Sequence, residues 1–266
     1  MNFFAILIAA IVVGVIGLII GLLLGVAGEK FKVQVDENEL KVRDCLPGNN
    51  CGGCGYAGCD ALAKAIVSNE ASVDACPVGG SATAKAISAI MGVKSEEQEK
   101  MVAFIRCSGS CDQVTRQYNY FGEADCRQIA VVPGQGEKKC AYACMGYGSC
   151  VKACPFDAIS IEGGVAVVDK EKCRACKKCL DVCPNNLIEM VPYRSAYLVK
   201  CHSKDKGKDT KAACKAGCIG CTLCTKVCET GAITVNDNLA HIDYSKCTNC
   251  GKCAEKCPSK VIYHRI

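Results

Sequence analysis

The feature that most constrains this chain is a cysteine pattern that occurs twice at one fixed offset. Of its 266 residues, 26 are cysteines. The run Cys173-x2-Cys176-x2-Cys179-x3-Cys183-Pro184 returns further along as Cys247-x2-Cys250-x2-Cys253-x3-Cys257-Pro258. The preceding pair repeats at the same offset, as Cys150-x3-Cys154 and Cys224-x3-Cys228. Such tight spacings leave little room for disulfide geometry, and they suit thiolates wrapped around one inorganic cluster.

Short alternating runs between these motifs predict a β-hairpin in each copy. The paired runs are residues 158–161 with 165–168, and residues 232–235 with 240–243. Cysteine motif, hairpin and cysteine motif in this order are typical of a bacterial two-cluster ferredoxin. We therefore expect an α+β protein with two tandem 2[4Fe-4S] modules, at residues 140–192 and 214–266.

In a two-cluster ferredoxin the fourth cysteine of each motif ligates the other cluster. For the second module this predicts two sets of ligands: Cys218, Cys221, Cys224 and Cys257, and Cys228, Cys247, Cys250 and Cys253. For the first module the same rule predicts one set directly: Cys154, Cys173, Cys176 and Cys179.

The first copy departs from the repeat at Tyr147, which occupies the position equivalent to Cys221. Tyrosine is a poor ligand for such a cluster. The same offset relates Cys214 to Cys140, so we expect a loop widened at residues 146–148 to bring Cys140 into the site. The expected set is Cys140, Cys144, Cys150 and Cys183.

A separate glycine-rich motif precedes the modules and predicts a small helical four-cysteine domain over residues 45–92. Its expected ligands are Cys51, Cys54, Cys59 and Cys76. Helices are predicted over residues 57–67 and 81–91, the second capped by Ser81 and ended by Gly92. A zinc site is the alternative, because the C-x2-C motif is common to zinc sites and iron–sulfur sites. The glycine-rich setting, which lets the backbone bend around sulfur, favours a fifth [4Fe-4S] cluster.

Six cysteines stay outside these five sets: Cys45, Cys107, Cys111, Cys126, Cys201 and Cys214. In the connecting region 93–139, Cys107, Cys111 and Cys126 could hold a sixth cluster, with Cys140 or Cys214 as fourth ligand. The other interpretation is that they are buried free thiols, since cysteine packs as a small hydrophobic residue.

The N-terminus predicts a single-pass membrane anchor over residues 1–28. Residues 3–27 carry no charge, and as a helix they would reach about 37 Å, enough to cross a hydrocarbon core. A cleaved signal peptide would have a basic start and a shorter apolar run. Lys30 and Lys32 follow the segment, which favours the inner membrane of a bacterial cell with the cysteine domains on the cytoplasmic side. Residues 29–44 and 193–213 are polar and are expected to be linkers.

The net charge of +5 does not indicate a nucleic-acid partner. Each [4Fe-4S] core held by four thiolates has a net charge of about 2−, so five clusters would make the protein acidic. The chain has no dinucleotide-binding fingerprint and no phosphate-binding loop, so we do not expect it to bind nicotinamide itself.

The order of these parts closely resembles the B subunit of the Rnf complex, the ion-translocating ferredoxin:NAD+ oxidoreductase or electron transport complex. The segments that carry the resemblance are residues 46–59, LPGNNCGGCGYAGC, and residues 147–159, YGSCVKACPFDAI. The second module and the region from Cys107 to Cys126 resemble the longer form found in anaerobic bacteria.

The resemblance implies a subunit that relays electrons from soluble ferredoxin toward partner chains that bind flavin and NAD or span the membrane. The whole complex would couple this transfer to Na+ or H+ translocation. Two other hypotheses remain open at this point. One is a membrane-anchored polyferredoxin that serves another reductase or a hydrogenase. The other is a zinc- or disulfide-stabilised interaction protein on a membrane stalk.

Overall fold

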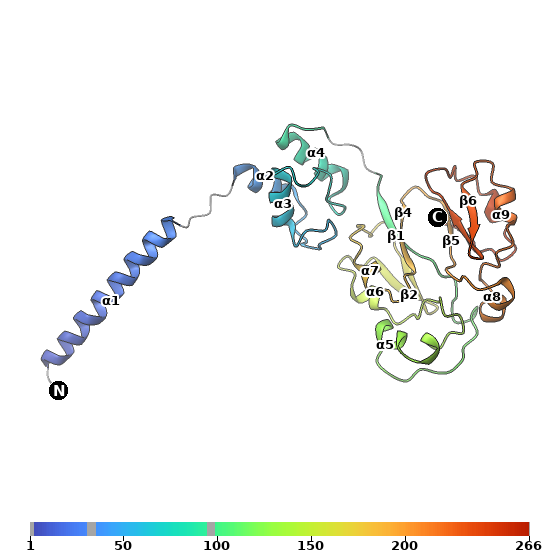
Figure 1. Ribbon diagram of the computed structural model, residues 1–266, viewed down its shortest axis with the longest axis horizontal. Helices are drawn as coiled ribbons and strands as arrows, with labels where there is room; N and C mark the ends of the chain where they lie inside the picture. Colours follow the sequence, from blue (N-terminus) through green and yellow to red (C-terminus); the bar gives the residue numbers. More distant parts are fainter. Residues whose placement is uncertain (1–2, 31–35, 95–98, 266) are drawn as a thin grey trace.

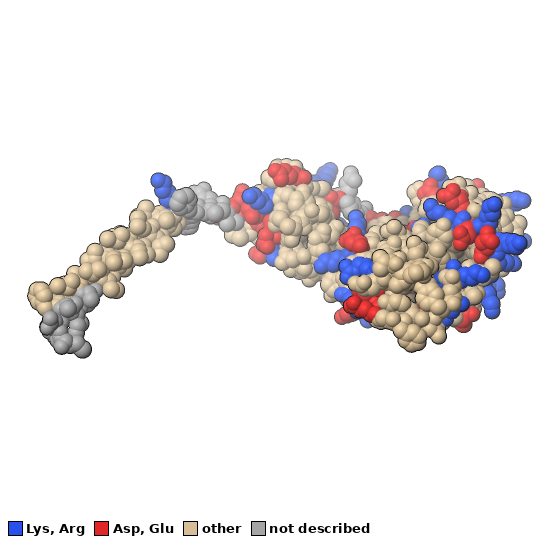
Figure 2. Space-filling model, turned by 60° about the horizontal axis from the view of Figure 1, so that its bottom comes forward, with Lys and Arg blue, Asp and Glu red and all other residues tan. Residues whose placement is uncertain are grey.

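A computed structural model describes residues 3–30, 36–94 and 99–265 as a long helix, a small helical domain and two ferredoxin modules (Figure 1). Helix α1 (Phe3–Lys30) stands apart from the rest. Its segment Ile11–Lys30 is long and apolar enough to cross a membrane, and none of it is buried within the molecule. Charged side chains are absent along most of its length in Figure 2. Lys32 lies outside the described residues.

Three helices form the small domain: α2 (Glu37–Cys45), α3 (Cys59–Val67) and α4 (Gly80–Met91). Their core contains Val42, Leu62, Ile66 and Ile87, each at most 1 % exposed. The expectation of a linker over residues 29–44 is therefore wrong at its C-terminal end. Helix α2 begins after Asp36, whose carboxylate accepts the Asn38 N–H at 2.8 Å, and buries one apolar face in this core.

The two helices predicted for this domain are confirmed, with one difference. Gly92 ends α4 in the left-handed conformation at φ 68°, as expected of a C-terminal glycine. Ser81 does not cap α4: it lies inside the helix, and Gly79 occupies the N-cap without a side-chain hydrogen bond. The helix follows directly from the Cys76-Pro77 turn and so starts earlier than the serine suggested.

Each ferredoxin module contains the predicted hairpin. Strand β2 (Ile159–Glu162) pairs antiparallel with β3 (Val165–Val168), and β6 (Ile233–Asn236) pairs with β7 (Leu239–Ile242). One face of each hairpin packs on the cysteines of its own module. Each cysteine motif contains a short helix that carries one of its cysteines: α6 (Ser149–Lys152), α7 (Lys178–Asp181), α9 (Leu223–Lys226) and α10 (Lys252–Glu255).

A second pair of strands completes each module, and its first strand places the start of the module earlier than predicted. Strand β1 (Met101–Ile105) pairs with β4 (Ile188–Pro192), and β5 (Tyr197–Val199) pairs with β8 (Ile262–His264). The modules therefore begin near residues 101 and 197, earlier than residues 140 and 214. The spacing of cysteines could not predict this, because β1 and β5 contain none.

The segments expected to connect the modules are also folded. Within residues 193–213, helix α8 (Gly207–Ala213) follows β5, and both Ser203 and Thr210 are buried. The region after β1 contains α5 (Cys126–Ala130) and a short 3-10 helix, η1 (Pro133–Gln135). Both segments belong to the compact body that holds the cysteines.

Candidate metal centres

Sixteen of the cysteines line four small cavities, four to each cavity. All 26 lie in the described residues, and none of them forms a disulfide bond there. Among the described residues, no three His, Cys, Asp or Glu side chains converge closely enough to hold a single metal ion. Four sulfurs spread around a cavity instead suit a larger inorganic group with one thiolate at each corner.

The second module holds the two sets that the repeat predicted. One cavity is lined by the second inner set, which is Cys218, Cys221, Cys224 and Cys257. Another is lined by the second outer set, which is Cys228, Cys247, Cys250 and Cys253. Cys221 and Cys250 are exposed, so each site of this module reaches the protein surface.

In the first module, the first outer set contains the four expected thiols: Cys154, Cys173, Cys176 and Cys179. The first inner set differs from the expected one. Its cavity is lined by Cys126, Cys144, Cys150 and Cys183. Cys140, which we expected here, lines a different cavity. The prediction that Cys140 shares a site with Cys144, Cys150 and Cys183 is therefore not what the structure shows.

The physical reason is that the loop around Tyr147 is not widened. Gly146 and Gly148 have φ of 81° and 76°, close to the 65° and 59° of Gly220 and Thr222 in the second module. The first loop passes so close to the hairpin turn that a Cβ on Gly146 would lie 2.4 Å from the Gly164 oxygen. The backbone keeps the ferredoxin shape, and the missing sulfur comes from elsewhere.

Helix α5 supplies that sulfur from a segment that the repeat does not include. Asp125 caps the helix by accepting the Arg127 N–H at 2.8 Å, and the Ser149 hydroxyl accepts the Cys126 N–H at 2.8 Å. Tyr147 packs edge-on against Tyr120, with 5.7 Å between ring centroids, in the apolar cluster that also holds Cys126. Tyr147, which replaces the cysteine of the repeat, therefore belongs to the apolar cluster that holds Cys126 and α5 in place.

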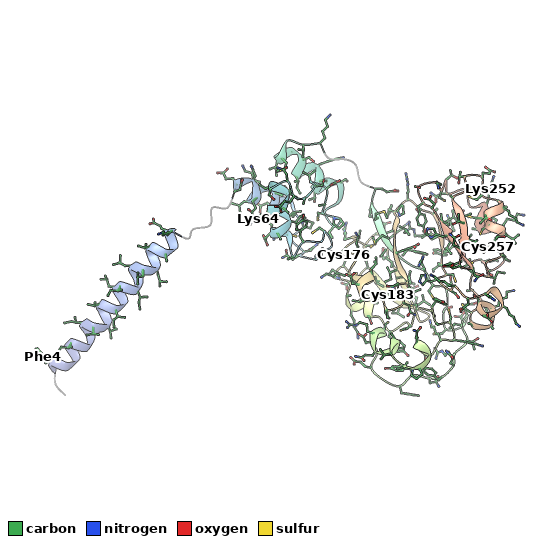
Figure 3. All side chains as sticks on the ribbon, viewed as in Figure 1. Phe4, Lys64, Cys176, Cys183, Lys252 and Cys257 are labelled. Carbon is green, nitrogen blue, oxygen red and sulfur yellow. The ribbon has the colours of Figure 1, made fainter. Side chains whose placement is uncertain are left out.

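The small domain groups Cys54, Cys59 and Cys76 around its core, and the Gly79 N–H donates to the Cys76 sulfur at 3.4 Å. Cys51, the fourth expected ligand, lies near Cys176 of the first outer set, and we call these four cysteines the glycine-loop set. The loop that carries them lies against the first outer set: a Cβ on Gly53 would lie 2.9 Å from the Cys176 oxygen. Cys176 lies on the side of the first module next to the small domain, and Cys183 lies farther from that domain (Figure 3).

The environment of the sulfurs fits cluster ligands. Burial raises the pKa of the Cys150 and Cys179 thiols to about 12, so neither would ionise unaided at neutral pH. Iron cations would hold such thiols as thiolates. Backbone N–H groups point at many of the sulfurs, as those of Ala103 on Cys173 and Ala166 on Cys144 do at 3.4 Å. These donors stabilise negative charge on sulfur without adding bulk.

The possible sixth set of Cys107, Cys111 and Cys126 is not brought together. Cys126 belongs to the first inner set, and Cys107 lines the cavity that contains Cys140. Cys111 is exposed, and its sulfur accepts an Arg116 N–H at 3.1 Å. Cys45 packs at the edge of the small domain outside the four thiols. A signal for Cys107 does exist in the sequence, because Ile105-Arg106-Cys107 resembles Val199-Lys200-Cys201.

Three family profiles match separate parts of the chain. An Fe-S cluster family matches residues 46–78, a 4Fe-4S binding domain matches residues 166–189, and a 4Fe-4S dicluster domain matches residues 217–261. These profiles cover parts of the small domain, the first module and the second module. None of them includes Cys107, Cys126, Cys140, Cys201 or Cys214.

Similar proteins span nearly the whole chain. The B subunit of the Na(+)-translocating ferredoxin:NAD(+) oxidoreductase complex of Acetobacterium woodii is 47 % identical over 97 % of this chain and 78 % of its own length. The B subunit of an ion-translocating oxidoreductase complex of Methanosarcina acetivorans is 45 % identical over 93 % of this chain and 94 % of its own. The proton-translocating counterpart of Clostridium ljungdahlii is 38 % identical over 95 % of this chain and 90 % of its own.

Proposed function

Because this chain belongs to the family of B subunits of ion-translocating ferredoxin:NAD(+) oxidoreductase (Rnf) complexes, we propose that it is the iron–sulfur electron-transfer subunit of such a complex. The observation that carries the proposal is the series of five four-cysteine sets connected to an apolar N-terminal helix. A [4Fe-4S] cluster held by four thiolates takes up and releases one electron at a time. The complex would couple ferredoxin oxidation and NAD+ reduction to Na+ or H+ translocation.

The proposed ligands are the cysteines of the five sets described above. In the first inner set the ligand is Cys126, in place of Cys140. The first outer set lies between the first inner set and the glycine-loop set, since Cys179 neighbours Cys150 and Cys176 neighbours Cys51. Electrons that reach the first module can therefore pass to the small domain, which the chain connects directly to α1.

Soluble ferredoxin is the proposed electron donor, and the second module is its proposed docking surface. This module, residues 197–265, contains twelve Lys and Arg but six Asp and Glu. Figure 2 shows basic side chains over this end of the molecule. The excess of six positive charges outweighs the charge of about 2− that each of the two clusters of this module would add. The surface would therefore attract a loaded ferredoxin, which gains negative charge from its own clusters. Two sites also reach the surface here, at Cys221 and Cys250.

The docking proposal is tested with Lys226→Glu and Lys256→Glu, two exposed positions beside the cysteine motifs. At low ionic strength, ferredoxin should reduce each variant more slowly than it reduces the wild-type protein. This difference in rate should become smaller as added salt screens the charges. Lys64→Glu on the small domain makes the same charge change and should leave the rate unchanged. Equal rates in all three variants would exclude this surface.

The proposed partners are the flavin- and NAD-binding chains and the integral membrane chains of the complex. Lys30 at the end of α1 favours the cytoplasmic side of a bacterial inner membrane for the cysteine domains. Affinity purification of the tagged full chain should recover flavoprotein and NAD-binding chains. Recovery of a hydrogenase or an unrelated reductase instead would favour a polyferredoxin of another system. Protease added to inside-out vesicles should digest the modules, and it should spare them in right-side-out vesicles.

Anaerobic purification of the full chain in detergent provides the central test. Iron and labile sulfide should reach about 20–24 atoms each per chain, with EPR signals of reduced [4Fe-4S] clusters. Zinc without labile sulfide would overturn the proposal. Cys221→Ala should remove about four irons from the second module. An unchanged iron content in that variant would overturn the ligand assignment for the second inner set.

A further inference from the structure

Four cysteines outside the family profiles line one cavity between the two ferredoxin modules. Cys107 and Cys140 come from the first module, and Cys201 and Cys214 come from the second. Three of the four are buried and Cys140 is half-buried. A Cβ on Gly109 would lie 3.5 Å from the Cys107 sulfur and 3.6 Å from the Cys214 sulfur, so the modules bring these sulfurs to the same glycine.

The cavity has the internal symmetry of the repeat. Cys140 and Cys214 are related by the same offset as Cys173 and Cys247. Cys107 and Cys201 each stand two positions after a strand, β1 and β5, that pairs with the last strand of its module. Two equivalent pairs of thiols therefore face each other across the module boundary.

Backbone N–H groups are directed at all four sulfurs in one pattern. Each sulfur accepts the N–H of the residue two positions later: Gly109 for Cys107, Tyr142 for Cys140, Ser203 for Cys201 and Ala216 for Cys214. Cluster sites use such donors to stabilise negative sulfur. Four buried neutral thiols would gain less from these donors, because a neutral thiol sulfur is only a weak acceptor.

The module boundary is held in register around the cavity. The Thr115 N–H donates to the Ala213 oxygen at 2.9 Å, and the Lys215 N–H donates to the Gln113 oxygen at 2.8 Å. Arg106 of the first module also hydrogen-bonds His202 of the second. The four thiols are thus fixed relative to one another by contacts on both sides of Cys214.

We propose that Cys107, Cys140, Cys201 and Cys214, the bridging set, hold a sixth [4Fe-4S] cluster that transfers electrons between the two ferredoxin modules. The inference rests on the proposed function, because it assumes that the other sets are loaded. It leaves only Cys45 and Cys111 of the 26 cysteines without a ligand role.

Two hydrogen bonds connect the bridging set to its neighbours. The Cys218 N–H of the second inner set donates to the Cys201 sulfur at 3.3 Å, and the Cys144 N–H of the first inner set donates to the Cys107 sulfur at 3.4 Å. With clusters bound, one electron would move from the second inner set's cluster to the bridging cluster and from there to the first inner set's cluster. No bond would form or break, and the bridging cluster would return to its starting oxidation state.

The test uses the full chain purified anaerobically in detergent, with iron, sulfide and zinc measured per chain. Cys140→Ala and Cys201→Ala remove one thiol from each module. Each variant should lose about four irons, and the double variant should lose no more than either single variant, since both thiols serve one site. Cys111→Ala, an exposed cysteine on the same segment as Cys107, should keep all its iron.

Full iron content in the single variants, or losses that add in the double variant, would overturn the inference while leaving the other five sets standing. Stoichiometric zinc retained beside about 20 irons would also overturn it. Should an alanine variant fail to fold, Cys214→Ser preserves the side-chain volume. Its EPR spectrum should change at one cluster, because oxygen replaces a sulfur ligand; an unchanged spectrum would count against the site. Absence of labile sulfide from the wild-type chain would instead overturn the proposed function as a whole.

Discussion

At the scale of single residues, Lys138 lies between the first inner set and the bridging set. It is only 4 % exposed, and its ammonium donates to the Gly109 oxygen at 2.7 Å and the Gly164 oxygen at 2.8 Å. Burial raises the pKa of the Cys144 thiol to about 11, and the Lys138 charge opposes that rise. Burial also raises the pKa of Cys214, again opposed by Lys138. One buried cation therefore acts on a sulfur of each site.

We predict that Lys138→Met lowers the midpoint potentials of the two neighbouring clusters. Removing a unit of positive charge a few ångströms from sulfur favours the oxidised, less negative state, by on the order of 100 mV per electron at an effective dielectric constant of about 20. EPR-monitored redox titration of the full chain measures the change. The variant should also unfold more easily by about 1–3 kcal/mol, because two buried carbonyls lose their donor.

Lys139→Met is the matched control, since it removes the same charge from an exposed neighbouring position. Its titration curve should match that of the wild type, because solvent screens the exposed charge. Lys138→Arg keeps the charge, so the midpoint potentials of the two clusters should stay close to those of the wild type. Equal shifts in Lys138→Met and Lys139→Met would show that only net charge matters.

At the scale of elements, α5 compensates for the cysteine that the first module lacks. The loop at residues 146–148 keeps the backbone conformation of residues 220–222, so Tyr147 stands where Cys221 stands in the second module. The apolar cluster around Ile129 and Met145 holds α5 against this loop. A four-sulfur site therefore survives the substitution, because a distant helix is packed at the open corner.

We predict that Cys126→Ala loses about four irons and that adding Tyr147→Cys restores part of them. The single change removes one thiolate of the first inner set. The second returns a thiolate to the position that the repeat uses, on a backbone that already has the required shape. Iron content and EPR signal intensity of the purified chain measure both effects.

Tyr147→Phe in the Cys126→Ala background keeps the ring and offers no thiolate, so it should restore no iron. Iron contents that are equal in Cys126→Ala and the wild type would contradict the role of α5. A gain of iron in the phenylalanine variant would show that packing alone explains the rescue.

At the scale of the whole molecule, the proposed sites would form a path from the exposed end of the second module to the small domain, which the chain connects to α1. The second module offers exposed sulfurs, and the bridging set lies at the module boundary. The first outer set touches the small domain, which follows α1 in the chain (Figure 1). Electron transfer from the first module to the small domain would depend on the contact between Gly53 and Cys176.

We predict that Gly53→Val slows electron transfer between the first module and the small domain without removing iron. The Cβ of any larger residue would lie 2.9 Å from the Cys176 oxygen and 3.0 Å from its Cα, so the two backbones must move apart. Stopped-flow reduction of the full chain by dithionite-reduced ferredoxin should show a slower final phase. Ala57→Val enlarges an exposed position of the same loop and should reduce at the wild-type rate. Identical kinetics in both variants would argue against this contact as the route.

The sequence by itself determined the parts with local signatures. Two cysteine motifs at one fixed offset predicted two ferredoxin modules and their hairpins, and the structure contains both. The same spacing predicted the composition of both sets in the second module and of the first outer set. The structure brings the cysteines of these three sets together, because the members of one set lie close together in the chain, apart from one cysteine of the neighbouring motif at a fixed spacing. Their role as cluster ligands stays a prediction.

Only the tertiary structure decided the sites whose thiols lie far apart in the chain. Cys126 reaches the first inner set through a helix outside the repeat, and β1 and β5 pair with the last strands of their modules to direct Cys107 and Cys201 toward each other. Long-range pairing leaves no fixed spacing between the residues that it brings together. The sequence could therefore show that six cysteines lie outside the five predicted sets. Only the packing of the two modules could show which cysteines lie around the same cavity.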